Sequence, residues 1–121
     1  MAYHVKVARS ALSDAEQAYA WMKERHSEDQ ATRWYNGLVE AVFSLESFPR
    51  RCPLAPESDE IGVELRQHLY GKRSAAYRIV FTVEETAEGE GVVQIFCIWH
   101  GARDRIKASD LDREGSDEFI E

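Results

Sequence analysis

Apolar and polar residues alternate over the first few positions of the chain. Residues 2–8 place Val5 and Val7 on one side and His4 and Lys6 on the other. A period of two is typical of a strand that buries one of its faces. The pattern therefore predicts a short strand at the start of the chain.

A helical period follows this strand. The stretch Ser13 to Glu16 has capping-box spacing and predicts the start of a helix that ends near His26. The stretch Ser27 to Gln30 repeats that spacing and predicts a second, longer helix, which Pro49 ends. Apolar residues recur every three or four positions in both helices. Because the turn between the helices is very short, we expect an antiparallel helix hairpin.

The period returns to two after a loop that contains all three prolines. This loop is expected from Phe48 to Gly62, and strands are expected at 63–69 and 77–83. Residues 92–99 are almost wholly apolar, as in a central strand covered on both faces. The predicted fold is α+β with the order β-α-α-β-β-β, an antiparallel sheet covered on one face by the helix hairpin.

Composition supports one domain followed by a charged tail. The chain has 121 residues and a formal net charge of −7, which excludes a polycation that coats nucleic acid. Residues 108–121 contain one Lys/Arg and six Asp/Glu, so we expect a domain over 1–107 and an acidic tail over 108–121. Two alternatives stay open for the tail, which either folds back over the basic residues before it or is simply solvated.

The chain is expected to act in the cytoplasm. No apolar run approaches the roughly 18–20 residues of a membrane span, and the first residues lack the apolar stretch of a signal peptide. Cys52 and Cys97 are not spaced as a metal or redox pair, so we expect reduced thiols, Cys97 buried and Cys52 exposed. With no glycine-rich phosphate loop and no metal-ligand spacing, no metal and no cofactor are expected.

The basic residues of the second half are candidates for an anion site. Acidic residues of this region are grouped at Glu84 to Glu90, and the basic residues lie outside that stretch. If the strands pair, we expect the bases to converge while the acids occupy a distant hairpin tip. The basic candidates are Arg66, His68, Lys72, Arg73, Arg78, Arg103, Arg105 and Lys107.

Two stretches could carry chemistry. His100 and Arg103 directly follow the most apolar strand, where histidine can exchange protons and arginine can stabilise a phosphate. The alternative is a plain turn with solvated arginines. Arg78 lies mid-strand and must point away from Tyr77 and Ile79. It either lines an open groove or forms a structural salt bridge, for which Glu64 is the candidate partner.

Three short motifs carry a family resemblance. They are Leu45-Glu46-Ser47-Phe48-Pro49, Ala76-Tyr77-Arg78-Ile79-Val80-Phe81 and His100-Gly101-Ala102-Arg103-Asp104. In their order and spacing the chain resembles the RelE/ParE superfamily of toxins from bacterial type II toxin–antitoxin (plasmid stabilisation) systems, and is closer to the ParE-like branch. The resemblance implies a growth-arresting toxin that is held inactive in an oligomer with its cognate antitoxin.

The resemblance leaves the target open. RelE-type toxins cut mRNA on the ribosome without a metal. For such an activity the resemblance implies that Arg78 and Arg103 of this chain bind the phosphate and that His100 transfers a proton. ParE-type toxins instead inhibit DNA gyrase and are not nucleases. Where RelE-type toxins often have a tyrosine, this chain has Ser109, which favours gyrase or another protein target. A relative that has lost toxicity is the third alternative. The remaining bases (Arg66, His68, Lys72, Arg73, Arg105 and Lys107) are then expected to contact the target.

Overall fold

The computed structural model describes residues 2–72 and 75–101. The elements in chain order are β1 (Tyr3–Val7), α1 (Arg9–Arg25), α2 (Glu28–Phe43), two 3-10 turns (Ser44–Glu46 and Pro49–Arg51), α3 (Ser58–Ile61), β2 (Arg66–Tyr70), β3 (Tyr77–Glu85) and β4 (Gly91–His100). The order confirms the predicted β-α-α-β-β-β arrangement. The single turn α3 lies inside the segment that was predicted to be a loop.

The strands form one sheet in the order β1-β4-β3-β2. β2 pairs antiparallel with β3, and β3 antiparallel with β4, as predicted. β1 instead pairs parallel with β4, with Val5 opposite Val93, so the sheet is mixed and the prediction of an antiparallel sheet was wrong at this edge. Alternation within a strand reports which face is buried, but it carries no information on the direction of the neighbouring strand.

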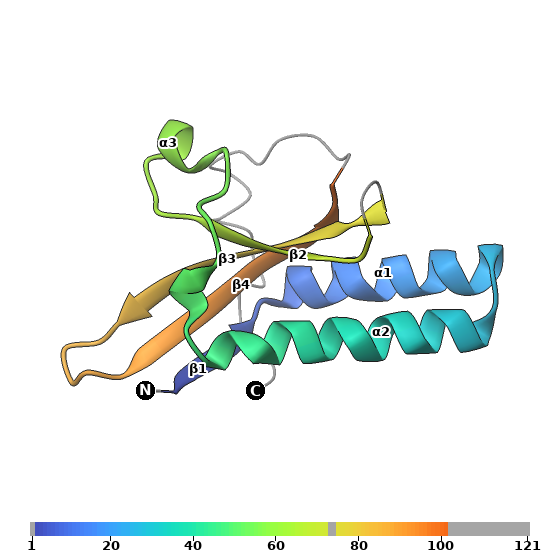
Figure 1. Ribbon diagram of the computed structural model, residues 1–121, viewed down its shortest axis with the longest axis horizontal. Coiled ribbons are helices and arrows are strands. Elements are labelled where there is room, and N and C mark those ends of the chain that lie inside the picture. Colours follow the sequence, from blue (N-terminus) through green and yellow to red (C-terminus); the bar gives the residue numbers. More distant parts are fainter. Residues whose placement is uncertain (1, 73–74, 102–121) are drawn as a thin grey trace.

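Helices α1 and α2 lie side by side along one face of the sheet (Figure 1). The predicted start of α2 is confirmed, since the Ser27 hydroxyl accepts a hydrogen bond from the Gln30 backbone N–H at 3.1 Å. The predicted end at Pro49 was wrong, because α2 ends at Phe43 and is one residue shorter than α1. The prediction for α1 was wrong by about one turn. This helix begins at Arg9, and Ser13 lies within it, where its hydroxyl accepts a hydrogen bond from the Gln17 side chain.

Two hydrophobic cores flank the sheet. The larger core lies between the sheet and the helix hairpin and includes Val5, Leu38, Ile79, Phe81 and Ile95. The smaller core lies on the opposite face, where Ala55, Leu65, Val80, Cys97 and Trp99 pack together. Residues 55–65, which include α3, therefore cover this second face of the sheet. As a result, β4 is buried on both faces near its end.

Cys52 differs from its predicted environment. Expected to be exposed, it is buried in the larger core, because the 3-10 turn before it directs its side chain inward. Trp21 is 48% exposed near the end of α1. None of the helices among the described residues is long and apolar enough to cross a membrane.

Candidate functional site

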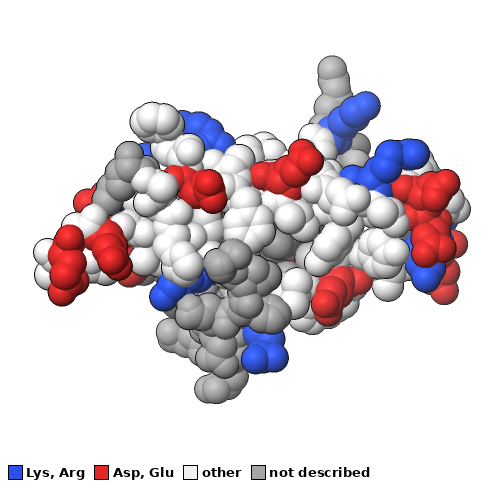
Figure 2. Space-filling model, turned by 90° about the horizontal axis from the view of Figure 1, so that it is seen from below, with Lys and Arg blue, Asp and Glu red and all other residues white. Residues whose placement is uncertain are grey.

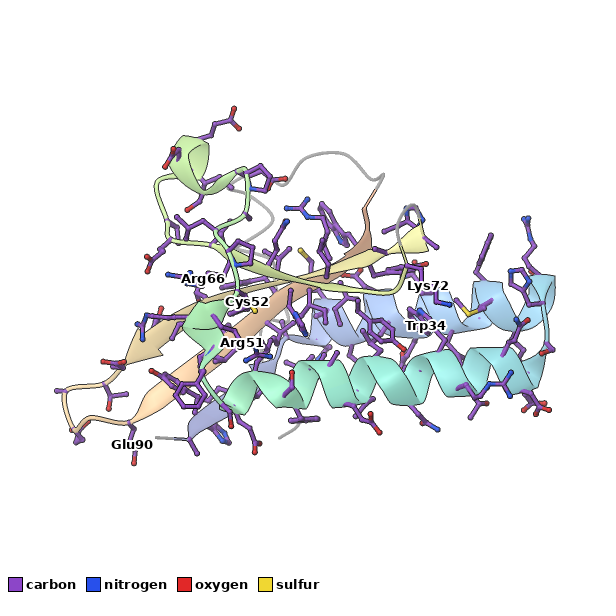
Figure 3. All side chains as sticks on the ribbon, viewed as in Figure 1. Trp34, Arg51, Cys52, Arg66, Lys72 and Glu90 are labelled. Carbon is purple, nitrogen blue, oxygen red and sulfur yellow. The ribbon has the colours of Figure 1, made fainter. Side chains whose placement is uncertain are left out.

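The predicted basic candidates do not meet at one place. Four of them, Arg73, Arg103, Arg105 and Lys107, lie outside the described residues, as does the acidic tail. The others separate into three places, and Figure 3 shows Arg66 and Lys72 well apart along the sheet. The expected convergence was therefore wrong for the basic residues that the structure describes.

The first place is a buried ion pair on the face of the sheet opposite the helix hairpin. Arg78 of β3 points to this face, as the alternation predicted. Its Nη1 and Nη2 donate to both carboxylate oxygens of Glu57, at 3.0 and 2.7 Å, and its Nε donates to the Gln67 side chain at 2.9 Å. The geometry supports the salt-bridge alternative, with Glu57 as the partner rather than Glu64.

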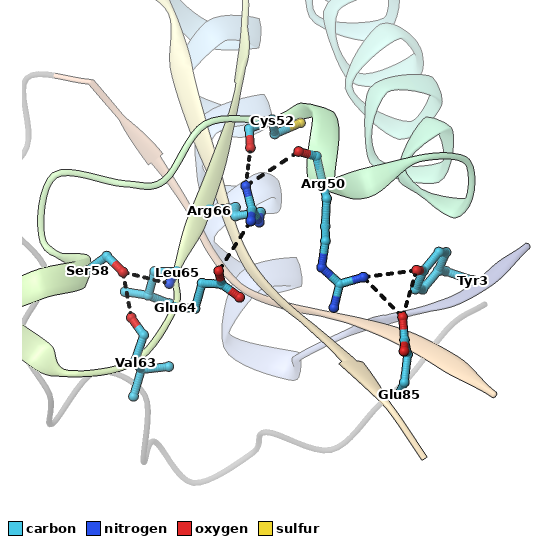
Figure 4. A network of polar contacts seen from close by, with 9 residues as sticks. All are labelled: Tyr3, Arg50, Cys52, Ser58, Val63, Glu64, Leu65, Arg66 and Glu85. Atoms are coloured by element: carbon cyan, nitrogen blue, oxygen red, sulfur yellow. Dashed lines mark hydrogen bonds and ion pairs between the residues drawn. The ribbon is translucent and has the colours of Figure 1, made fainter. Parts of the chain in front are cut away.

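The second place is the helix-facing side of β2, next to the 3-10 turn at Pro49–Arg51. Arg66 donates to the Cys52 carbonyl at 2.7 Å and forms an ion pair of 3.3 Å with Glu64 (Figure 4). His68 shares this face, since it is opposite Ile79 of the larger core. Burial, with the nearby charge of Arg51, holds the pKa of His68 below its usual value. Arg66 and His68 thus cannot enlarge a surface around Arg78, which lies across the sheet.

The third place is a groove of about 970 Å³ between the outer end of the helix hairpin and the end of the sheet. We call it the aromatic groove. It is lined by Trp21, Met22, His26, Gln30, Trp34, Tyr70, Gly71, Lys72, Ala75, Tyr77 and His100. The groove is within the size range of ordinary ligand sites and is mostly apolar.

Edge-to-face ring contacts build the floor of the aromatic groove. The ring of Tyr77 lies 5.1 Å from that of Trp34 and 5.2 Å from that of His100. The Tyr70 hydroxyl donates to the Trp34 carbonyl at 2.8 Å, which fixes the end of β2 against α2. Figure 3 shows Trp34 and Lys72 at this end of the molecule. The floor is therefore preorganised by contacts between the helices and the sheet.

The electrostatics of the aromatic groove suit binding better than catalysis. Burial raises the pKa of Tyr77, and burial together with Glu40 raises the pKa of Tyr70, so both phenols stay protonated at neutral pH. Among the described residues no carboxylate lines the groove, whereas Lys72 and two histidines do. The lining of the groove is thus chemically suited to an apolar or anionic group.

The acidic residues lie at the far end of the sheet, as predicted. Glu90 marks this end in Figure 3, and Figure 2 shows carboxylates at its left end, with others in the middle and at the right of the same face. At this end of the sheet Glu85 accepts one hydrogen bond from Arg50 at 3.0 Å and one from Tyr3 at 3.1 Å (Figure 4). These bonds hold the pKa of Glu85 below its usual value.

Sequence reasoning missed two features of these sites. Trp34 and Tyr70 carry only an apolar pattern, which predicts core packing and does not show that one side of each ring borders an open groove. Glu57 is a single acid in a proline-containing loop, and no local signal marks it as the partner of Arg78. No cluster of three or more His, Cys, Asp or Glu with the geometry of a metal site occurs within residues 2–72 and 75–101.

The mixed sheet, the helix hairpin on one face and the short helical segment on the other are consistent with the RelE/ParE-like fold. The family model of the ParE toxin of type II toxin–antitoxin systems, parDE, matches residues 5–105. The chain therefore belongs to the ParE toxin family.

Among solved structures the chain is similar to a chain of the chromosomal ParDE toxin–antitoxin system from P. aeruginosa. The TM-score is 0.61 at 17% sequence identity, over 81% of this chain and 95% of that chain. At this identity the similarity establishes the fold. No curated protein matches the chain.

Proposed function

We propose that this toxin arrests growth by binding a protein target, with DNA gyrase as the first candidate, and that its cognate antitoxin neutralises it. Membership of the ParE family supports a toxin of a type II system. The acidic net charge of −7 also supports a protein target, because broad binding to ribosomal RNA favours a basic surface.

One observation carries the choice of a non-nucleolytic mode. Tyr77 is opposite His100 and Arg78 is opposite Trp99, so Arg78 and His100 project to opposite faces of the sheet. An arginine and a proton donor must reach the same phosphate to cleave RNA together. Arg78 is moreover bound at two points by Glu57. The described part of the chain therefore favours binding over RNA cleavage.

We assign the antitoxin to the aromatic groove. The groove is preorganised, mostly apolar and bordered by Lys72, which suits an apolar segment with acidic residues beside it. Trp21 is exposed on the rim with Arg25 stacked on its ring, 5.1 Å from the centroid. A tryptophan in this position is a common anchor for a partner chain.

The test begins in bacteria. Induced expression of the chain should stop growth, and co-expression of the small protein encoded beside it should restore growth. The purified chain should then inhibit DNA supercoiling by gyrase and leave mRNA intact in a translation extract. Ribosome-dependent cuts in mRNA would instead establish the RelE-type activity. Harmless expression would show that toxicity has been lost.

A further inference from the structure

Phe48 lies on the surface, although its large apolar side chain favours burial. Its side chain is 79% exposed, the highest value among the large hydrophobic residues that the structure describes. The neighbouring Pro49 is fully buried. The fold therefore buries the smaller apolar residue and turns the larger one to solvent, although burial of a phenylalanine would stabilise the protein by about 1.5–3 kcal/mol.

The backbone of Phe48 is also strained. It has φ 48° and ψ 55°, and it is the one non-glycine residue with positive φ among residues 2–72 and 75–101. The left-handed region costs a residue with a Cβ roughly 1–2 kcal/mol. Glycine would occupy this position without strain, so a phenylalanine here carries two costs, exposure and conformation.

The neighbouring residues hold this strained turn in place. The Arg51 guanidinium donates to the Ser47 carbonyl at 2.6 Å and to the Phe48 carbonyl at 3.1 Å. It also donates to the Ser44 hydroxyl at 3.2 Å, and the Arg51 backbone N–H donates to the Phe48 carbonyl. Strained residues persist where the surroundings over-determine them, and such residues concentrate at functional sites.

Two exposed arginines stand two and three residues after Phe48. Arg50 is exposed and is fixed by Tyr3 and Glu85, with Nη1 at 3.1 and 3.0 Å from their oxygens (Figure 4). Arg51 is exposed and, within the described part of the chain, its guanidinium contacts only carbonyl and hydroxyl oxygens. An exposed aromatic side chain on a turn that an arginine holds in place has the composition of an interface anchor.

We infer that Phe48 is the anchor through which this toxin engages its protein target, entering an apolar pocket that carries carboxylates at its border. The inference rests on the proposed function. The anchor follows the C-terminal end of α2, whereas the aromatic groove lies along its N-terminal half. These are roughly 15–20 Å apart along the helix. Target and antitoxin therefore use different surfaces of the toxin.

The experiment compares Phe48→Ala with Leu69→Ala, a matched control that removes a 56% exposed apolar side chain from β2. Phe48→Ala should weaken growth arrest, and gyrase inhibition where the wild type shows it, by at least about tenfold. It should keep its thermal midpoint and its affinity for the antitoxin. Leu69→Ala should match the wild type in all assays.

Three outcomes separate the proposals. A toxic wild type and an equally toxic Phe48→Ala overturn the role of Phe48 and leave the proposed function intact. A Phe48→Ala variant that loses antitoxin affinity along with toxicity also overturns it, since the two surfaces would then not be distinct. A wild type that does not affect growth overturns the proposed function, and the anchor with it.

Discussion

Glu57 and Arg78 form a two-point ion pair that links the residue before the short helix α3 to the face of the sheet opposite the helix hairpin. The two residues are 21 positions apart, and their side chains are almost fully buried. A buried charge pair with good geometry balances its own desolvation, but either charge alone does not. This asymmetry gives a direct test of whether the pair is structural.

Removal of one partner should destabilise the protein strongly. Glu57→Gln leaves the Arg78 guanidinium buried without a counter-charge, so the free energy of unfolding should fall by about 3–5 kcal/mol. Arg78→Met removes the two hydrogen bonds that Glu57 accepts from the guanidinium and should also destabilise the protein. The double variant should lose clearly less than the sum of the two single losses. Urea denaturation of the four proteins measures these differences.

If the loss in the double variant equalled the sum of the two single losses, Glu57 and Arg78 would not stabilise each other. A change of Glu64 provides the control, because that carboxylate is mostly exposed and pairs with Arg66. Glu64→Gln should change the free energy of unfolding by no more than about 1 kcal/mol. If Glu64→Gln were the more damaging substitution, the partner expected from the sequence would be the correct one.

The sequence could predict the direction of Arg78 but not its partner. Alternation along β3 places Arg78 on the face opposite Ile79, and this depends only on strand geometry. The partner depends on how the loop after Pro53 closes over that face, which no local pattern encodes. The same limit applies to the convergence of the basic residues, because the face of β2 that carries Arg66 and His68 depends on its register with β3.

The stability of the protein should require glycine at position 37, because the Tyr70 side chain packs directly against it. A Cβ at Gly37 would overlap the Tyr70 hydroxyl oxygen and lie 3.1 Å from its Cζ. Glycine to alanine in a helix normally stabilises by about 1 kcal/mol. Here the overlap should reverse the sign, and Gly37→Ala should lower the free energy of unfolding by about 1–3 kcal/mol. Thermal denaturation is the measurement.

Two further variants test this cause. In a Tyr70→Phe background, where the overlapping oxygen is absent, Gly37→Ala should be clearly less harmful than in the wild type. Asn36→Ala, one residue earlier on the exposed side of α2, should be neutral or slightly stabilising. Equal damage in both backgrounds would show that the hydroxyl is not the cause.

Both cysteines should resist modification in the folded protein. Cys52 and Cys97 are buried, and burial raises the pKa of Cys52 despite the nearby Arg51 and Arg66 charges. Reaction with a thiol reagent should therefore be at least about a hundredfold slower than in urea. Cys52→Ser and Cys97→Ser separate the two thiols, and fast reaction of Cys52 would restore the expectation of an exposed side chain.

The helices and strands were easier to predict than the burial of individual side chains such as Cys52. Helix and strand periods identify the elements, and the Ser27 cap marks the start of α2 correctly. Cys52 follows a proline and two arginines, a composition typical of an exposed loop. Its burial results from the 3-10 turn, which also produces the left-handed Phe48. Turn geometry of this kind depends on tertiary contacts such as those of Arg51, and local sequence alone does not predict it.

His68 should make the stability of the protein depend on pH. Burial and the charge of Arg51 hold its pKa in the folded state below the ordinary value of 6.5. The unfolded chain therefore binds more protons between the two pKa values, and stability rises with pH in that range. As the pH falls below about 6.5, the wild type should lose stability, and His68→Gln, which has no ionisable group there, should lose less.

Urea denaturation between about pH 5 and 7.5 measures this difference, with His4→Gln as the matched control on an exposed position of β1. Each variant differs from the wild type at one histidine, so the comparison isolates that residue. The curve of His68→Gln should be flatter at the acidic end than the curves of the wild type and His4→Gln. A curve for His68→Gln that runs parallel to the wild type would show that the histidine is not held neutral by burial beside Arg51.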